Sequence, residues 1–164
     1  MDISTYNKTA LEIFRTISDM GPISLYRTNA ESELPIGTIH RHFKRMLSAD
    51  IIKPYDVSNK GRKKIEYGPT LYGIIYFYKT DLFIRKNLDR YFEKWVQKKQ
   101  FVDELKEAGF DDSMLESDFD ESKKVFSMFV HFYAGVEEEL DYFAKNLSEI
   151  SRDSRWCLGA FLLV

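Results

Sequence analysis

The sequence predicts a mainly α-helical fold with a small β-hairpin near its middle and a helical C-terminal region. Apolar residues recur at helical spacing in three segments before residue 50, alternate with a period of two between residues 51 and 67, and return to helical spacing after residue 70. The chain has 164 residues, of which 44% are hydrophobic and 30% charged. This balance is typical of a globular protein, and the length suits one ordinary domain or a small domain with a helical appendage.

Three short helices are expected first. The first covers residues 5–20, where apolar side chains form one stripe before Gly21-Pro22 ends the helix. The second covers residues 25–33, with Ser24 as its N-cap. A tight turn at Leu34-Pro35-Ile36-Gly37 leads into a third helix over residues 36–49, whose apolar residues cluster on one side.

A β-hairpin is predicted next, from two strand-like runs at residues 51–57 and 62–67. The intervening residues Ser58-Asn59-Lys60-Gly61 form a turn in which glycine supplies the positive φ angle. Pro54 has no backbone N–H and therefore argues for an edge strand.

Gly68-Pro69 is the expected boundary between two domains, residues 1–69 and 70–164. A long helical zone over residues 71–100 carries apolar residues at alternating spacings of three and four, with gaps at Asp81 and Lys98, which is typical of a coiled-coil or bundle seam. We expect these residues to form a dimer seam or, alternatively, to line an effector pocket: Phe77, Ile84, Leu88, Tyr91 and Trp95. A last helix is expected near residues 121–150, and the apolar segment Trp156–Val164 is expected to pack within the dimer.

The third helix carries the pattern that points to function. Opposite its apolar cluster lie Thr38, Arg41 and Arg45, flanked by His42 and Lys44. Two arginines one turn apart can enter the same major groove and donate to guanine or phosphate, and His42 is included among the residues expected to contact bases. The alternative interpretation is a solvated amphipathic helix with a basic face.

A second group of cations lies in the hairpin. The turn and return strand read Lys60-Gly61-Arg62-Lys63-Lys64, four cations in five residues. Such a tip can follow a DNA backbone or minor groove, where each phosphate contact releases a counterion. Cations also protect edge strands from aggregation, and both roles can coexist.

The charge distribution agrees with a polyanion partner for the front half alone. Residues 1–79 hold 12 Lys and Arg against 8 Asp and Glu, a net charge of +4. Residues 80–164 hold 12 against 18, a net charge of −6, which returns the overall −2. Chance unevenness in solvated faces is the alternative explanation.

Residues 34–52 and the later Thr70-x-x-Gly73 resemble winged-helix regulators of the MarR and PadR kind, over about residues 11–78. Asp50 departs from the glycine usual in such proteins before the first wing strand, but aspartate tolerates the left-handed conformation. The resemblance implies a DNA-binding transcriptional regulator that acts as a homodimer on a pseudo-palindromic duplex. It also implies an effector bound between domains in some relatives.

Other function classes find little support in the sequence. The single cysteine, Cys157, excludes an intramolecular disulfide and fits a cytoplasmic location. The longest apolar run, residues 156–164, is far shorter than the ~20 residues that span a bilayer. His40 and His42 point about 200° apart on a helix and cannot share one metal ion. We therefore predict no enzyme, no cofactor, no metal and no membrane partner.

The second hypothesis is a winged helix that docks onto another protein, such as the transcription machinery, without specific DNA binding. The acidic, aromatic-rich back half motivates it, since 19 of the 25 aromatic residues lie at or after Tyr72. Fold alone does not decide between the two hypotheses.

Overall fold

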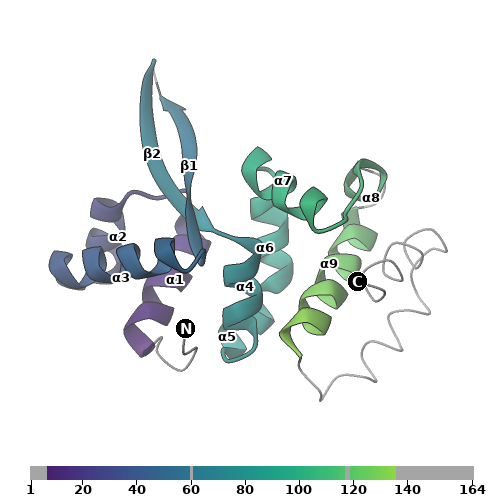
Figure 1. Ribbon diagram of the computed structural model, residues 1–164, viewed down its shortest axis with the longest axis horizontal. Helices are drawn as coiled ribbons and strands as arrows, with labels where there is room; N and C mark the ends of the chain where they lie inside the picture. The colour runs from purple at the N-terminus through teal and green to yellow at the C-terminus, as the bar shows by residue number, and fades with distance from the viewer. Residues whose placement is uncertain (1–6, 60, 117–118, 136–164) are drawn as a thin grey trace. The chain divides into compact units, whose positions relative to one another are not determined.

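The computed structural model describes residues 7–59, 61–116 and 119–135, and side chains at 57–59, 62 and 63 are outside that description. Within it the chain is mainly helical with one small antiparallel hairpin (Figure 1). It divides into two compact units, Met1–Ile74 and Ile75–Val164. The division therefore falls inside a helix rather than at Gly68-Pro69, where the sequence predicted it.

The first unit begins with three helices, α1 (Lys8–Met20), α2 (Leu25–Ser32) and α3 (Ile36–Ser48). The Asn7 side chain accepts a hydrogen bond from the Ala10 amide, so α1 starts three residues later than predicted. Ser24 caps α2 as predicted, accepting from the Arg27 amide. Each of these caps depends only on residues within three positions of the helix start.

The hairpin pairs β1 (Ile52–Asn59) with β2 (Arg62–Pro69) in register from Ile52 opposite Pro69 to Asn59 opposite Arg62. Gly61 has φ +79°, as the predicted turn requires. Ile23, between α1 and α2, pairs with Tyr67 through two backbone hydrogen bonds of 3.0 and 2.8 Å. Because that bridge occupies the other side of β2, β1 lies at the edge in the described residues, as Pro54 predicted.

The junction between α3 and the hairpin is held by Thr70 and Gly73. Asp50 adopts φ +56°, so the left-handed turn predicted for it is confirmed. The Thr70 hydroxyl lies 2.6 Å from the Asp50 carbonyl oxygen and accepts from the Gly73 amide at 2.8 Å. These bonds tie the first turn of α4 (Leu71–Tyr78) to the loop after α3, which explains why that turn belongs to the first unit.

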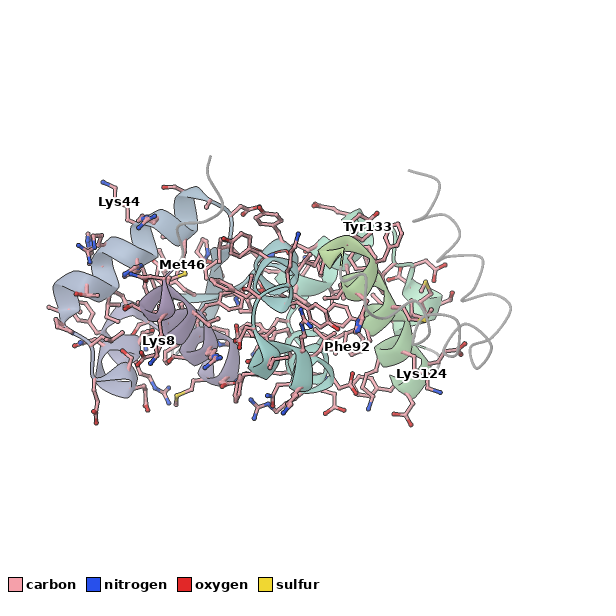
Figure 2. All side chains as sticks on the ribbon, turned by 90° about the horizontal axis from the view of Figure 1, so that it is seen from below. Lys8, Lys44, Met46, Phe92, Lys124 and Tyr133 are labelled. Carbon is pink, nitrogen blue, oxygen red and sulfur yellow. The ribbon has the colours of Figure 1, made fainter. Side chains whose placement is uncertain are left out.

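The core of the first unit forms from the apolar faces of α1, α3 and the base of the hairpin. Ile13, Phe14, Ile39 and Phe43 are fully or almost fully buried, and the Phe43 ring meets Tyr67 edge-on at 5.2 Å. Figure 2 shows Met46 directed inward from α3 and Lys44 directed outward. The amphipathic third helix predicted from spacing is thus confirmed.

The second unit contains five further helices in the described residues. They are α5 (Leu82–Lys86), α6 (Leu88–Trp95), α7 (Lys99–Glu107), α8 (Asp112–Glu116) and α9 (Phe119–Ala134). The long helical zone predicted over residues 71–100 is therefore wrong as one helix. It breaks at Asp81, which caps α5 by accepting from the Phe83 amide, and again at Asn87 and Lys98.

Aromatic side chains fill the core of the second unit. The Phe92 ring of α6 lies 4.9 Å from Phe126 of α9, and Phe110 lies 5.3 Å from Phe129. The five residues predicted for a dimer seam or effector pocket are buried in this same chain: Phe77, Ile84, Leu88, Tyr91 and Trp95. Their side chains are therefore unavailable to a second subunit. The prediction that these five residues form a dimer seam is wrong.

The last predicted helix corresponds in its first part to α9, which ends at Ala134, and its remaining residues 136–150 lie outside the described part of the chain. The segment Trp156–Val164 and its expected packing within a dimer lie outside the described residues. Among the helices that the structure describes, none has the length and apolar character needed to cross a membrane.

Candidate nucleic-acid interface

The outer face of α3 is cationic. Helical residues advance by about 100°, so Arg41, Lys44 and Arg45 fall opposite the buried Ile39 and Met46. All three cations are exposed, and Thr38 lies half-buried at the border of the two faces. The structure thus brings four of the predicted contact residues to one accessible surface, which we call the α3 cationic face (Thr38, Arg41, Lys44 and Arg45).

His42 does not belong to this face. Its side chain is 2% exposed, so the prediction that it contacts bases is wrong in this conformation. His42 follows Ile39 by three positions and precedes Met46 by four, a spacing that places it on the buried side of the helix. The polar character of His42 suggests the outer face of α3, but its angular position on the helix places it among the buried side chains.

Electrostatics around α3 act directly on His42. Burial, followed by the charges of Arg41 and Arg45, lowers the pKa of His42 below its ordinary 6.5. Neither ring nitrogen has a hydrogen-bond partner within the described residues. The ring is therefore held mainly neutral near pH 7, because neither solvent nor an acceptor stabilises its charged form.

The hairpin places further cations on its outer half. In the register of the two strands, Lys64 lies opposite Val57, Lys63 opposite Ser58 and Arg62 opposite Asn59. Each basic residue of β2 there thus faces an uncharged one on β1. The Lys60 position and the side chains of Arg62 and Lys63 fall outside what the structure describes.

Lys64 is exposed, and its Nζ lies 2.9 Å from a carboxylate oxygen of Glu66, two residues along the same strand. The Lys64 side chain is 54% exposed and can reach a phosphate, but the Glu66 side chain is only 13% exposed and would lose this ion pair. The predicted role of Lys64 is compatible with its position.

Two cationic or ionisable side chains near this surface were missed by the sequence reasoning. His40 is exposed on α3, although its spacing from His42 had raised only the question of a metal site. Lys53 on β1 is half-buried, with its Nζ 5.3 Å from the centre of the Tyr55 ring. The helical angle of His40 could have identified it, whereas the Lys53 stacking depends on the fold of the hairpin.

The composition of this surface suits the binding of anions. The sequence of α3 contains no Asp or Glu, so the α3 cationic face has no carboxylate on its own helix. In the part of the chain that the structure describes, no three His, Cys, Asp or Glu side chains converge as a metal site. Arginine and lysine side chains on an exposed helix face are suited to phosphate and base-edge contacts.

Comparison of the chain with protein-family models, with curated proteins and with solved structures gives no match. Functional assignment therefore depends on the chemistry and placement of the residues themselves.

Proposed function

We propose that the chain is a DNA-binding transcriptional regulator whose first unit is a winged helix. In this proposal α3 enters the major groove of a duplex and the hairpin is the wing, which contacts the flanking backbone or minor groove. The observation that carries it is the α3 cationic face, exposed on a helix that is anchored to the core by its opposite side.

The order of elements supports this proposal. Two short helices joined by a tight connection precede a hairpin, and an isolated bridge between Ile23 and Tyr67 ties the segment between α1 and α2 to β2. In the connection, Glu33 adopts φ +56° and the Asn29 side chain donates to the Leu34 carbonyl oxygen. Such a connection allows the second helix of the pair to project from the body of the domain.

The two cationic regions are assigned different tasks. Arg41 and Arg45 lie one turn apart and can each offer a planar fork to guanine O6 and N7, which reads sequence. Lys44 and the hairpin cations Lys60, Arg62, Lys63 and Lys64 are assigned to phosphates, which supply affinity without sequence preference.

A duplex selection followed by titration tests the groove assignment. The full chain would select sites from a random duplex pool, and binding would then be titrated at several salt concentrations. Replacing Arg41 and Arg45 with Ala should cost about 1–3 kcal/mol for each arginine–base pairing removed and abolish the preference for selected sites. A matched double variant, Lys79→Ala with Lys99→Ala, removes two exposed cations of the second unit and should bind like the original protein.

The wing assignment has a separate signature. Replacing Arg62, Lys63 and Lys64 with Gln should flatten the slope of log affinity against log salt by about one for each phosphate that is no longer neutralised. Preference among selected sites should remain. If neither set of substitutions alters duplex binding, the proposal fails.

A homodimer on a pseudo-palindromic site remains part of the proposal, with a seam built from residues other than the five buried ones. A two-fold symmetric protein matches half-sites separated by about one helical turn. Sedimentation measurement of the solution mass, with and without selected duplex, tests this part alone.

Docking onto a protein is the second candidate function. Tyr26 on α2 is 77% exposed and Ile65 on β2 is 59% exposed, and exposed apolar groups of this size suit a protein partner. Recovery of a stoichiometric partner that no longer binds after Tyr26→Ser and Ile65→Ser, together with no duplex affinity at low salt, would favour this alternative.

A further inference from the structure

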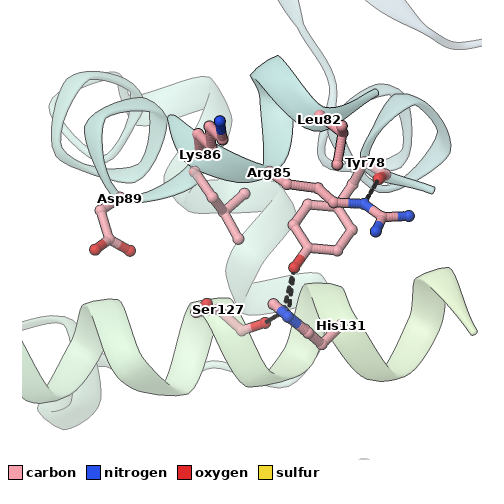
Figure 3. Close-up of a pocket in the computed structure, with 8 residues that line it drawn as sticks. Tyr78, Leu82, Arg85, Lys86, Asp89, Ser127 and His131 are labelled. Atoms are coloured by element: carbon pink, nitrogen blue, oxygen red, sulfur yellow. Dashed lines mark hydrogen bonds between the residues drawn. The ribbon is translucent and has the colours of Figure 1, made fainter. Parts of the chain in front are cut away.

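A pocket of about 340 Å³ lies within the second unit, lined by the end of α4, by α5, by the first residues of α6 and by α9 (Figure 3). Its volume is at the lower end of the range found for sites that hold small molecules. All its lining residues belong to the second unit, so the pocket is separate from the α3 cationic face.

One wall of the pocket is fixed by a pair of side chains from α4 and α9. The Tyr78 hydroxyl oxygen lies 2.5 Å from Nε2 and 2.6 Å from Nδ1 of His131, and Nδ1 lies 2.9 Å from the Ser127 carbonyl oxygen. A carbonyl oxygen can only accept, so in this contact Nδ1 carries the proton. In a neutral ring with the proton on Nδ1, Nε2 is the nitrogen that can accept from the Tyr78 hydroxyl. The dashed lines in Figure 3 mark the contacts among these three residues.

Leu82 supplies exposed apolar surface to the pocket. It is 67% exposed, whereas Tyr78 and Leu88 also line the pocket but are almost fully buried, so they form the wall behind it. Polar groups that already satisfy each other hold the wall in place, and a rigid wall reduces the entropy cost of binding.

Two cations border the same space. Arg85 donates from Nε to the Tyr78 carbonyl oxygen at 2.8 Å and from Nη2 to the Lys79 carbonyl oxygen at 2.7 Å. These neutral acceptors orient the guanidinium without cancelling its charge, and three of its five N–H groups remain outside these two bonds. Lys86 is exposed at the rim, next to Arg85 in sequence.

One carboxylate in the pocket lining carries the opposite charge to these two cations. Asp89 lines the rim of the pocket and is exposed. With Arg85 and Lys86 positive and Asp89 negative, the charged side chains of the lining sum to +1. That balance favours a ligand with a single negative charge over a phosphate dianion, which Asp89 would repel more strongly.

We propose that this pocket binds a small organic monocarboxylate whose body is apolar. The carboxylate lies toward Arg85 and Lys86, and the apolar body lies against the exposed side chain of Leu82. The inference does not rest on DNA binding, because it concerns the second unit and is tested without a duplex.

Calorimetric titration of the full chain tests the ligand class with three probes: naphthalene-2-carboxylate, its neutral carboxamide and inorganic phosphate. The carboxylate should bind with a dissociation constant of about 1 mM or below. The carboxamide and phosphate should each bind more weakly. No carboxylate binding, or equal binding of carboxylate and carboxamide, overturns the proposal.

Variants at exposed rim positions test the charge assignment without disturbing the core. Lys86→Gln should weaken carboxylate binding about two- to fivefold, and Asp89→Asn should strengthen it by a similar factor. Lys99→Gln removes an exposed lysine outside the pocket and should leave binding unchanged. If all three variants bind alike, these charges do not select the ligand and the proposal fails.

The three histidines locate the bound ligand. Carbon-labelled histidine gives one ring signal each for His40, His42 and His131. The carboxylate should shift the His131 signal, assigned with His131→Gln, and leave the two signals of the first unit in place. A shift of His40 or His42 without a shift of His131 places the ligand elsewhere and overturns the proposal.

Discussion

Gly73 of α4 packs directly against the backbone of Ile51. A Cβ atom added at Gly73 would overlap the Ile51 carbonyl oxygen and lie 3.0 Å from the Phe14 ring. Both neighbours belong to the buried core, and one is backbone that cannot rotate away. The absence of a side chain at this position therefore sets how closely the helix approaches the loop after α3.

Gly73→Ala should lower the free energy of unfolding by roughly 2–4 kcal/mol, since relief of the overlap requires α4 to shift. Urea denaturation measures the change. Gly37→Ala is the matched control, because an added Cβ at Gly37 meets nothing within 4 Å and the residue lies in α3. That variant should be more stable by about 0.5–1 kcal/mol, and a destabilisation at Gly37 equal to that at Gly73 would contradict the packing argument.

Thr70→Val should destabilise the fold by about 1–3 kcal/mol, because it removes a buried hydroxyl that donates to the Asp50 carbonyl and accepts from the Gly73 amide. Thr70→Ser keeps the hydroxyl and should recover most of the stability. Equal stability of the Val and Ser variants in urea denaturation would show that the hydroxyl contributes nothing.

His42 makes the stability of the chain depend on pH in a defined direction. Its folded-state pKa lies below 6.5, while the unfolded chain keeps a value of about 6.5. As the pH falls through 6.5 the unfolded chain takes up the proton first, so the free energy of unfolding decreases below that pH and is fully retained above it.

Denaturation at pH 7.5 and at pH 5.0 measures this dependence. The decrease between the two pH values should be smaller in His42→Leu than in the original protein. His40→Gln changes an exposed histidine of the same helix and should keep the original decrease. An unchanged decrease in the Leu variant would exclude His42 as its source.

Tyr78→Phe should lower the free energy of unfolding by about 1 kcal/mol, because it removes the hydroxyl that meets His131. Tyr26→Phe removes a hydroxyl from a side chain that is largely exposed, and its effect should stay within about 0.5 kcal/mol. Thermal melts of the two variants side by side distinguish a structural bond from a general effect of removing tyrosine.

Local signals explain which parts of the fold were predictable. The Ser24 cap, the left-handed Asp50 and the positive φ of Gly61 each depend on a few neighbouring residues, and each is confirmed. Burial by helical angle was also predictable. His42 was expected on the outer face of α3 because it is polar. Its spacing from Ile39 and Met46 instead places it on the buried side.

The gaps in the apolar pattern at Asp81 and Lys98 coincide with helix breaks. The break at Asn87 lies between Ile84 and Leu88, whose spacing of four is the same in one helix as in two, so the pattern could not reveal it.

Features that depend on contacts between residues far apart in the sequence could not be predicted from local patterns. Tyr78 and His131 are 53 residues apart, and no local pattern brings them to one pocket. The α3 cationic face was predictable because one helix supplies all of it.

Arg41 and Arg45 stand four positions apart on one exposed helical face, a spacing at which like charges repel by a few tenths of a kcal/mol. The packing of α3 against the core must therefore offset the repulsion between these two side chains. Any polyanion that spreads over this surface relieves the repulsion, so heparin or an unrelated duplex should raise the melting temperature of the free protein, and added sodium chloride should abolish the gain.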